Sequence, residues 1–391
     1  MTSTGQKETS ATPSPSPQIG GGERNTVLRV LMAAGGTGGH IFPALAVAEE
    51  LRARWSGPCD LAAGACRIEF VGAGREIEKR LIPAALFPLH VVAAAGLKGI
   101  GGLRKLRNFL VLPRSFWETW KLLSSLRPHV VVGVGGYVGG PVMLLAALRG
   151  IPTLLIEPNA TPGFTNRILA PFIRMAALGF KDAAPIYGAK ARVTGHPVRA
   201  AFNNITPKPH APPYTILVIG GSQGSIAINT AVTGALSLFS REDGQYKLVH
   251  QTGKRDFERV SQIYKKEAGI SAEASAFIDD VPRAFADADL MIGRSGASTV
   301  AELASAGKAS LLIPFPHAAD DHQLANARAL ERAGGARVLE QRELTPLRLF
   351  EEVTALCTPE TLAKMDQAAR ALSHPDATAR IADLIEGLAG C

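Results

Sequence analysis

The amino-acid sequence predicts an α/β protein made of two parallel-sheet domains, and three observations carry this prediction. Short apolar runs that suit strands alternate with longer segments whose apolar residues recur at helical spacing. Glycine clusters separate several of these runs from the helices that follow, as in folds that bind nucleotides. The succession of strand, glycine loop and helix begins near residue 28 and again near residue 214. A chain of 391 residues is long enough for each domain to have its own core.

The first unit, residues 28–51, contains the glycine cluster GGTGGH between an apolar run and a segment with helical spacing. Glycines let the backbone approach a ligand closely, and the free N–H groups of a helix's first turn favour an anion such as phosphate. The spacing matches neither GxGxxG nor the P-loop, so the loop either binds an anion or merely turns the chain. His40 ends the cluster and either acts as a base near neutral pH or caps the helix.

A second strand is predicted at residues 68–72, and a basic segment follows it. Ten Lys and Arg stand against three Glu between Arg75 and Arg127, which is +7 of the formal net charge of +8. Aromatic residues interleaved with these cations are typical of surfaces that enter the headgroup zone of anionic lipid. The alternative is a solvated helix face with core aromatics, and nucleic acid is disfavoured because no nucleic-acid module accompanies the patch. The candidates for a membrane patch are Lys98, Arg104, Lys105, Arg107, Phe116 and Trp117.

Residues 130–148 predict a strand, a second glycine loop and a helix rather than a membrane span, because five glycines and a proline divide them. The next predicted strand, 151–156, ends beside Glu157 and Asn159. Open α/β sheets bind ligands at the carboxyl ends of their strands, so both residues are site candidates. The alternative is that they only cap the loop.

The second half of the chain repeats the architecture of the first. Residues 203–213 have the composition of a linker. A strand is then predicted at 214–219, a third glycine loop at 220–225 and a helix at 226–238. Further strands are predicted at 247–250, 277–278, 290–292 and 311–314.

A run of small residues, 293–301, opens another predicted helix whose N-terminus could face a diphosphate. Glu302 follows one turn after Ser298, where it could reach ribose hydroxyls, or it is an exposed carboxylate near a favourable helix dipole. The polar loop 315–326 suggests hydrogen bonding to a sugar, and its spacing fits a zinc site poorly. An amphipathic helix at 376–388 ends the chain.

Composition excludes several other classes of protein. Residues 1–24 are rich in Ser, Thr, Pro and Gly, so we expect a disordered tail and see no secretory signal there. The four cysteines form no CxxC pair and have no histidine at metal-ligand spacing, which suits free thiols in a reducing cytosol. No DxD-like pair is placed to hold Mg²⁺ beside a diphosphate, so we expect no tightly bound metal and no cofactor.

Eight motifs occur in the order found in the UDP-N-acetylglucosamine:lipid I N-acetylglucosaminyltransferases of peptidoglycan synthesis, the MurG family. They are GGTGGH, GGYVGGP, EPNATPGFTN, GHPVR, GGSQGS, FIDD, RSGASTVAE and DDHQLANA. Each motif alone is weak, but eight in register make the resemblance, from residue 27 to the C-terminus, highly specific. It implies the GT-B fold, in which two Rossmann-like, doubly wound parallel-sheet domains face each other across a cleft. The acceptor and membrane domain would be 25–202 with the returning helix 376–390, and the UDP-sugar domain 214–375.

The resemblance also implies which residues meet the substrates. The acceptor diphosphate and the reacting sugar would lie at Thr37, Gly38 and Gly39, and Asn159 would reach the sugar from the same domain. The UDP-sugar would be held by Ile278 at the uracil, Ser222 and Arg199 near the nucleotide and phosphates, Ala297, Ser298 and Thr299 at the diphosphate, Glu302 on the ribose and Gln323 on N-acetylglucosamine.

By the same resemblance, His40 is the base that deprotonates the acceptor 4-hydroxyl as it attacks the anomeric carbon, with inversion. Donors aimed at the leaving diphosphate would stand in for a metal. Many members of the family carry a His-Glu-Gln-Asn run where this chain has Ile156, Glu157, Pro158 and Asn159. A second imidazole is therefore absent, and Glu157 remains as a rival base.

The resulting prediction is an inverting glycosyltransferase that moves N-acetylglucosamine from UDP onto lipid I to form lipid II. Its expected partners are the UDP-sugar, the undecaprenyl-diphosphate-linked acceptor and anionic lipid, without nucleic acid. Its expected location is the cytoplasmic face of the bacterial cell membrane, as a peripheral protein. The alternatives are another GT-B UDP-sugar:lipid glycosyltransferase, a UDP-N-acetylglucosamine epimerase, or a non-catalytic nucleotide-sugar sensor.

Overall fold

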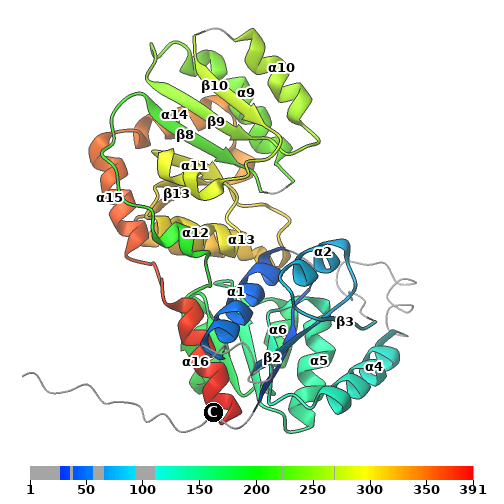
Figure 1. Ribbon diagram of the computed structural model, residues 1–391. Coiled ribbons are helices and arrows are strands. Elements are labelled where there is room, and N and C mark those ends of the chain that lie inside the picture. The colour runs from blue at the N-terminus through cyan, green and yellow to red at the C-terminus, as the bar shows by residue number, and fades with distance from the viewer. Residues whose placement is uncertain are drawn as a thin grey trace, which may run out of the picture.

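The computed structural model describes residues 27–35, 38–55, 66–93, 111–221, 223–267 and 269–390. It contains two α/β lobes stacked end to end, with the N-terminal lobe at the bottom of Figure 1 and the C-terminal lobe above it. The predicted fold class, two Rossmann-like parallel-sheet domains, is confirmed. Several predicted features lie outside the described residues, namely the tail 1–24, Thr37, Ser222, Lys98, Arg104, Lys105 and Arg107.

The N-terminal lobe is built on a seven-stranded parallel sheet in the order β3-β2-β1-β4-β5-β6-β7. Its strands are β1 (Leu28–Ala33), β2 (Cys66–Gly72), β3 (Leu89–Val91), β4 (Val130–Gly133), β5 (Thr153–Glu157), β6 (Met175–Leu178) and β7 (Ala191–Val193). One core face is covered by α1 (Gly38–Trp55), α2 (Glu76–Ala84) and α16 (Ala377–Ala389). The other face is covered by α4 (Val111–Leu126), α5 (Gly136–Leu148) and α6 (Phe164–Leu169).

The C-terminal lobe has a six-stranded parallel sheet in the order β10-β9-β8-β11-β12-β13. Its strands are β8 (Tyr214–Ile219), β9 (Tyr246–Gln251), β10 (Ser271–Ser275), β11 (Leu290–Gly293), β12 (Ser310–Leu312) and β13 (Ala336–Val338). One face packs against α9 (Ile226–Phe239), α10 (Phe257–Lys266) and α14 (Pro346–Leu356). The other packs against α11 (Val281–Asp287), α12 (Ala297–Ala306) and α13 (His322–Arg332), with α15 (Pro359–Arg370) contributing to both cores.

The strand predicted at residues 277–278 is wrong. The edge strand is β10, whose sequence Ser-Ala-Glu-Ala-Ser carries little apolar signal. Because β10 is an edge strand that pairs with β9 alone, it needs less apolar side-chain surface than a central strand. A prediction based on apolar runs therefore misses it. Residues 277–278 follow β10 in a loop, which places Ile278 at the carboxyl edge of the sheet.

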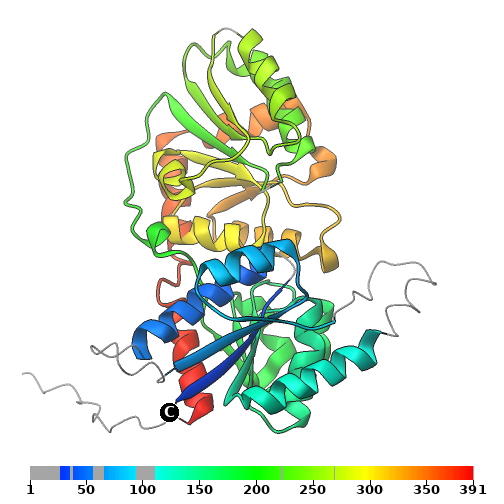
Figure 2. The same cartoon turned by 45° about the vertical axis from the view of Figure 1, so that its right-hand side comes forward.

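Helix α16 leaves the C-terminal lobe and packs against the N-terminal lobe, as both views show (Figures 1 and 2). Its buried Ile381 and Ile385 join the core formed by α1 and the central strands. The indole nitrogen of Trp55 donates to a carboxylate oxygen of Glu386 over 2.6 Å. Arg54 adds an ion pair with Asp383 at 2.6 Å. The chain therefore crosses between the lobes twice, and α16 fixes the second crossover to the N-terminal lobe.

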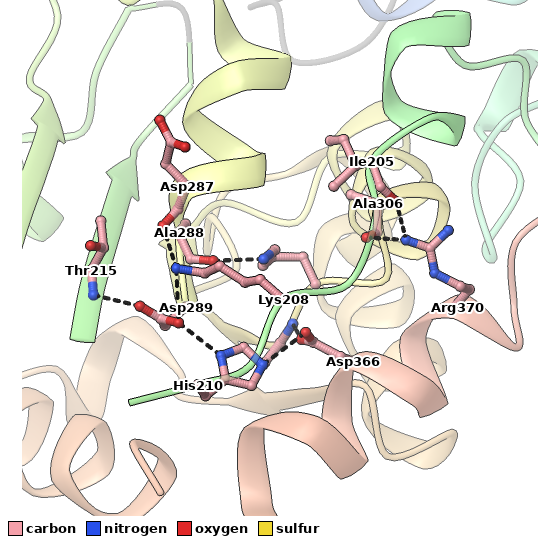
Figure 3. Close-up of polar contacts among 12 residues, drawn as sticks. Ile205, Lys208, His210, Thr215, Asp287, Ala288, Asp289, Ala306, Asp366 and Arg370 are labelled. Carbon is pink, nitrogen blue, oxygen red and sulfur yellow. Dashed lines mark hydrogen bonds and ion pairs between the residues drawn. The ribbon is translucent and has the colours of Figure 1, made fainter. Parts of the chain in front are cut away.

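Residue 203, the first of the predicted linker 203–213, ends a short helix, and the segment 204–213 is held against the C-terminal lobe by polar contacts (Figure 3). His210 lies between Asp289 at 2.8 Å and Asp366 at 3.1 Å. Lys208 donates to the backbone oxygen of Asp287 over 2.8 Å, and Arg370 donates to that of Ile205 over 2.7 Å. The first crossover between the lobes is therefore anchored on α15, the helix that leads to the second crossover.

Candidate active site

Two glycine loops of the N-terminal lobe meet around His40. The loop after β1 and the loop after β4 approach so closely that a β-carbon on Gly136 would lie 2.7 Å from the carbonyl oxygen of Gly35. His40 is in the first turn of α1, and its Nδ1 lies 3.2 Å from that same oxygen. A β-carbon on Gly135 would lie 3.2 Å from Nε2 of His40, so a side chain at position 135 would cover this atom.

The surroundings of His40 favour a neutral imidazole. Burial lowers its pKa, the hydrogen bond to Gly35 acts in the opposite direction, and the nearby His322 lowers it further. Because a carbonyl oxygen can only accept, Nδ1 carries the hydrogen of the neutral ring and donates it to Gly35. Nε2 then carries the lone pair of the neutral ring, which is the protonation state that a general base requires.

Glu157, the rival base, is completely buried at the end of β5. One of its carboxylate oxygens accepts from the backbone and side-chain nitrogens of Asn159 over 3.0 and 3.2 Å. The other accepts from Asn166 over 2.7 Å and from the hydroxyl of Tyr187 over 3.4 Å. Burial raises the pKa of this carboxyl. With both oxygens engaged by Asn159, Asn166 and Tyr187, Glu157 fits a role in organising the loop better than a role as base.

Asn159 lies where the two lobes touch. Its side-chain oxygen accepts from Nδ2 of Asn326 in α13 over 3.2 Å, and the Oδ1 of Asn326 accepts from the backbone nitrogen of Ala160 over 2.8 Å. Nδ2 of Asn326 also lies 3.3 Å from the backbone oxygen of Ser295, before α12. Asn326 is fully buried and therefore fixes the loop of Asn159 against the start of α12.

The small residues predicted at the diphosphate, Ala297, Ser298 and Thr299, form the first turn of α12 directly after β11. All three are partly exposed, and the first N–H groups of a helix have no partner within the helix. One turn later, Glu302 pairs with Arg199, which lies at the start of the first crossover, at 3.2 Å. Burial raises the pKa of Glu302, and Arg199 opposes that shift. Gly38 and Gly39 are the first two residues of α1, directly before His40.

The residues predicted at the uracil and the sugar, Ile278 and Gln323, both hydrogen-bond to neighbouring loops, Ile278 through Gln251, which the sequence did not single out. The backbone nitrogen of Ile278 donates to Oε1 of Gln251 over 2.9 Å, and Nε2 of Gln251 donates to the backbone oxygen of Gly221 over 3.1 Å. Oε1 of Gln323 accepts from the backbone nitrogen of Phe315 over 3.0 Å. These bonds connect the loops at the carboxyl edge of the C-terminal sheet, where such sheets bind ligands.

The residues that the sequence analysis missed lie within or beside the recognised motifs. Each of them hydrogen-bonds to a segment that is distant in the sequence. Asn326 lies within DDHQLANA, and His196 within GHPVR. Arg294, next to the start of α12, donates to Ser225 over 2.8 Å and to Gln341 over 2.7 Å. The motifs flagged these positions, but no local pattern indicates which partners they have.

The aromatic residues of the predicted membrane patch differ in exposure. The ring of Phe116 is partly buried and packs against the core under α4 and α5. Trp117 and Trp120 are exposed, with fractions of 57% and 51%. Lys121 lies 3.5 Å from the ring centre of Trp117, which places a cation on an exposed aromatic face. Helical spacing explains the difference, because residues 116 and 117 point to different faces of α4.

A metal site and a membrane span are two alternatives that the sequence raised. Within the described ranges, no three His, Cys, Asp or Glu side chains gather closely enough to hold a metal ion. None of the described helices is both long and apolar enough to span a bilayer.

Comparison with known proteins gives consistent matches along the chain. Residues 30–178 match the N-terminal domain of glycosyltransferase family 28, and residues 215–381 match its C-terminal domain. A protein of Myxococcus xanthus named UDP-N-acetylglucosamine–N-acetylmuramyl-(pentapeptide) pyrophosphoryl-undecaprenol N-acetylglucosamine transferase is 42% identical, over 92% of each chain. A protein of Solibacter usitatus with the same name is 42% identical, over 93% of this chain and 97% of its own.

Solved structures agree with these relatives. The crystal structure of Acinetobacter baumannii MurG matches with a TM-score of 0.75 and 32% identity, covering 92% of this chain and 99% of that one. A putative UDP-N-acetylglucosamine 2-epimerase from Listeria monocytogenes matches with a TM-score of 0.66 but only 13% identity, over 93% and 96% of the two chains. The second likeness shows a common fold alone.

Proposed function

The chain belongs to the MurG family of glycosyltransferase family 28, and from this membership we propose that it transfers N-acetylglucosamine from UDP-N-acetylglucosamine to lipid I, forming lipid II for peptidoglycan synthesis. The relatives named for this reaction match nine-tenths of the chain. The structural observation that carries the proposal is the contact between the lobes, where Asn159 bonds to Asn326 and His196 bonds to Ser298 in the first turn of α12. His40 is close enough to His196 to lower its pKa. An epimerase is not favoured, because its likeness is confined to the fold.

In the proposed reaction, Nε2 of His40 accepts the proton of the acceptor 4-hydroxyl while that oxygen forms a bond to the anomeric carbon. The bond between this carbon and the UDP oxygen breaks on the opposite face, so the configuration inverts and UDP leaves with the electron pair. The neutral state of His40 near pH 7 supports this role. No covalent intermediate with the protein is needed.

The leaving diphosphate would be stabilised by the first turn of α12, through its N–H groups and the hydroxyls of Ser298 and Thr299. Arg199 supplies a positive charge next to this turn, held there by Glu302. Glu302 would also accept from the ribose hydroxyls, so that Arg199 and the ribose share its carboxylate. With these donors in place, we propose that transfer proceeds without a tightly bound metal ion.

Uracil would be recognised by the backbone at Ile278, which Gln251 holds in position. Gln323 and Asn159 would contact the N-acetylglucosamine from opposite lobes. Asn326 connects the loop of Asn159 to the segment before α12, so the two halves of the sugar site are positioned together. This arrangement would align the acceptor hydroxyl with the anomeric carbon.

The test is UDP release measured with and without lipid I, in EDTA and then with added Mg²⁺. We expect release that requires lipid I and stays within about twofold in EDTA, because the proposed stabilisation of UDP comes from protein groups. Turnover of the donor without acceptor would indicate an epimerase, and activity with diacylglycerol and UDP-glucose would indicate another lipid glycosyltransferase. Binding of the UDP-sugar without UDP release would indicate a sensor. Loss of activity in EDTA that Mg²⁺ restores would reject metal-free transfer.

We further propose that α4 and the basic segment before it bind anionic lipid at the cytoplasmic face of the membrane. Trp117 and Trp120 are exposed on α4, and Lys121 and Arg149 lie over their rings. Amphipathic rings beside cations suit the headgroup region, where one face is apolar and the charge meets lipid phosphate. Contact at this surface would place the protein beside the membrane that holds the lipid-linked acceptor.

Replacing Trp117 and Trp120 together by serine should weaken binding to vesicles of anionic lipid at least tenfold, because two ring anchors are lost. Co-sedimentation measures the effect, and the exposed Leu347 of the other lobe, changed to serine, is the matched control. Changing Lys98, Arg104, Lys105 and Arg107 to serine should also release the protein, at about 1 kcal/mol for each charge. Unchanged binding in both sets of variants would reject this surface as the membrane contact.

A further inference from the structure

We propose that His196 is a positioning residue that turns the hydroxyl of Ser298 toward the leaving diphosphate, and that it does so from the opposite lobe. The inference rests on the proposed donor site at the start of α12. It adds a residue whose effect passes through another side chain rather than through contact with substrate.

His196 lies between β7 (Ala191–Val193) and α8 (Ala200–Asn203), in the segment that leads out of the N-terminal lobe. It is 5% exposed, and its Nε2 lies 3.1 Å from Oγ of Ser298 in the first turn of α12. Ser298 itself is partly exposed, so its hydroxyl can reach both the imidazole and a ligand. The contact joins the N-terminal lobe to the part of the C-terminal lobe where the diphosphate is expected.

The hydrogen on the imidazole can be assigned from burial. Burial, with a smaller effect of His40, lowers the pKa of His196 to about 4, so the ring is neutral near pH 7 and carries one hydrogen. Its Nδ1 is buried and has no hydrogen-bond partner among the residues that the structure describes. A buried N–H without a partner is rarer and costlier than an unused acceptor. We therefore assign the hydrogen to Nε2, which donates it to Oγ of Ser298.

This assignment determines what the serine can do. Because Oγ of Ser298 accepts from His196, the hydrogen of its own hydroxyl is directed away from the imidazole and stays available as a donor. At the N-terminus of α12, the acceptor with the greatest demand for it would be an oxygen of the diphosphate. The developing negative charge on UDP would strengthen this bond as the sugar leaves.

The contact between His196 and Ser298 lies beside a cavity of about 160 Å³, which His196 lines together with Phe180 and with Val300 and Ala304 of α12. Through Nε2, the hydrogen bond to Ser298 ties the imidazole to the start of α12. Since the two residues belong to different lobes, this bond exists only when the lobes are in contact, and stabilisation of the leaving group would depend on that contact.

A double-mutant cycle with His196→Phe and Ser298→Ala tests the inference, with kcat, the KM for the donor and the affinity for UDP as readouts. We expect Ser298→Ala to lower kcat about tenfold or more and to weaken UDP binding. His196→Phe should lower kcat by a comparable factor with little change in KM, and the double variant should be no slower than Ser298→Ala alone. His196→Gln, which keeps an N–H donor, should recover most of the loss.

The control is His374→Phe, because His374 packs against Gly195 and borders the same cavity, and its kcat should stay within twofold of the wild type. Factors that multiply in the double variant, or a His196→Phe variant within twofold of the wild type, would overturn the proposal. If Ser298→Ala changes neither turnover nor UDP affinity, the proposed donor site fails instead. Should the phenylalanine variant not fold, His196→Leu takes its place in the cycle.

Discussion

Replacing His40 by glutamine is expected to lower kcat by about 100- to 10,000-fold, the range that a positioned general base contributes. The affinity for UDP-N-acetylglucosamine, measured by calorimetry, should change by less than about twofold, because the proposed donor contacts belong to other residues. Glutamine keeps a polar group near Gly35 but cannot accept a proton. The variant therefore separates loss of the base from loss of the fold.

The pH dependence provides a second readout. Burial holds the pKa of His40 below its usual value of 6.5, so the base is already unprotonated at pH 6.5 and above. The profile of kcat/KM should accordingly fall only at pH values below 6.5, where His40 gains a proton. In His40→Gln this acid limb should disappear. Turnover within about threefold of the wild type would place the base elsewhere, since less than 1 kcal/mol would then be at stake.

Glu157→Gln is the companion variant. The carboxylate accepts hydrogen bonds from Asn159, Asn166 and Tyr187. In glutamine, one of the two accepting oxygens is replaced by an NH₂ group, which cannot accept from these donors. We expect a lower melting temperature and a higher KM, with the acid limb of the pH profile retained. Loss of that limb in Glu157→Gln, with a near-normal His40→Gln, would reverse the two assignments.

Much of the fold followed from local patterns, and the exceptions have a physical reason. Central strands of both sheets are buried on two faces, so their sequences are continuous apolar runs such as those of β4 and β8. The edge strand β10 is solvated and polar, and no such signal marked it. Phe116 and Trp117 illustrate the same limit on a helix, because composition indicated an aromatic basic segment but not which ring faces the core.

The candidate site divides in a similar way. Glycine loops and helix starts are local features, so His40 and Ser298 could be located from their motifs. The contacts of Asn326 and His196 depend on how the two lobes meet, which no short window of sequence records. Resemblance to a family supplied roles for matched residues, whereas the network around these two residues required coordinates.

The segment 204–213 shows how composition can hide a specific interaction. Its prolines suggest a linker, yet His210 carries an imidazolium between two carboxylates that follow it by 79 and 156 positions. Hydrogen bonds to Asp289 and then to Asp366 raise the pKa of His210 to about 9. Burial by itself would raise the pKa of Asp289, but hydrogen bonds from His210, from the backbone of Thr215 and from Lys208 lower it.

These shifts predict that stability of the C-terminal lobe falls on the alkaline side. A histidine whose pKa is higher in the folded chain than its unfolded value of 6.5 contributes fully below pH 6.5, and this contribution is lost as the pH rises through about 9. We expect His210→Gln to reduce the free energy of unfolding by about 1–3 kcal/mol at pH 6, with solvent screening setting the lower value. Above pH 9.5 the variant and the wild type should converge.

Scanning calorimetry of the full chain from pH 6 to 10 measures this difference. Comparing variant with wild type at each pH removes the contributions of other groups, including Lys308, whose pKa burial lowers. The exposed His317, changed to glutamine, is the matched control and should follow the wild-type curve. A constant difference across the range would mean that His210 contributes packing rather than charge. A difference that vanishes above pH 9.5 requires that the imidazolium between Asp289 and Asp366 holds the first crossover on α15.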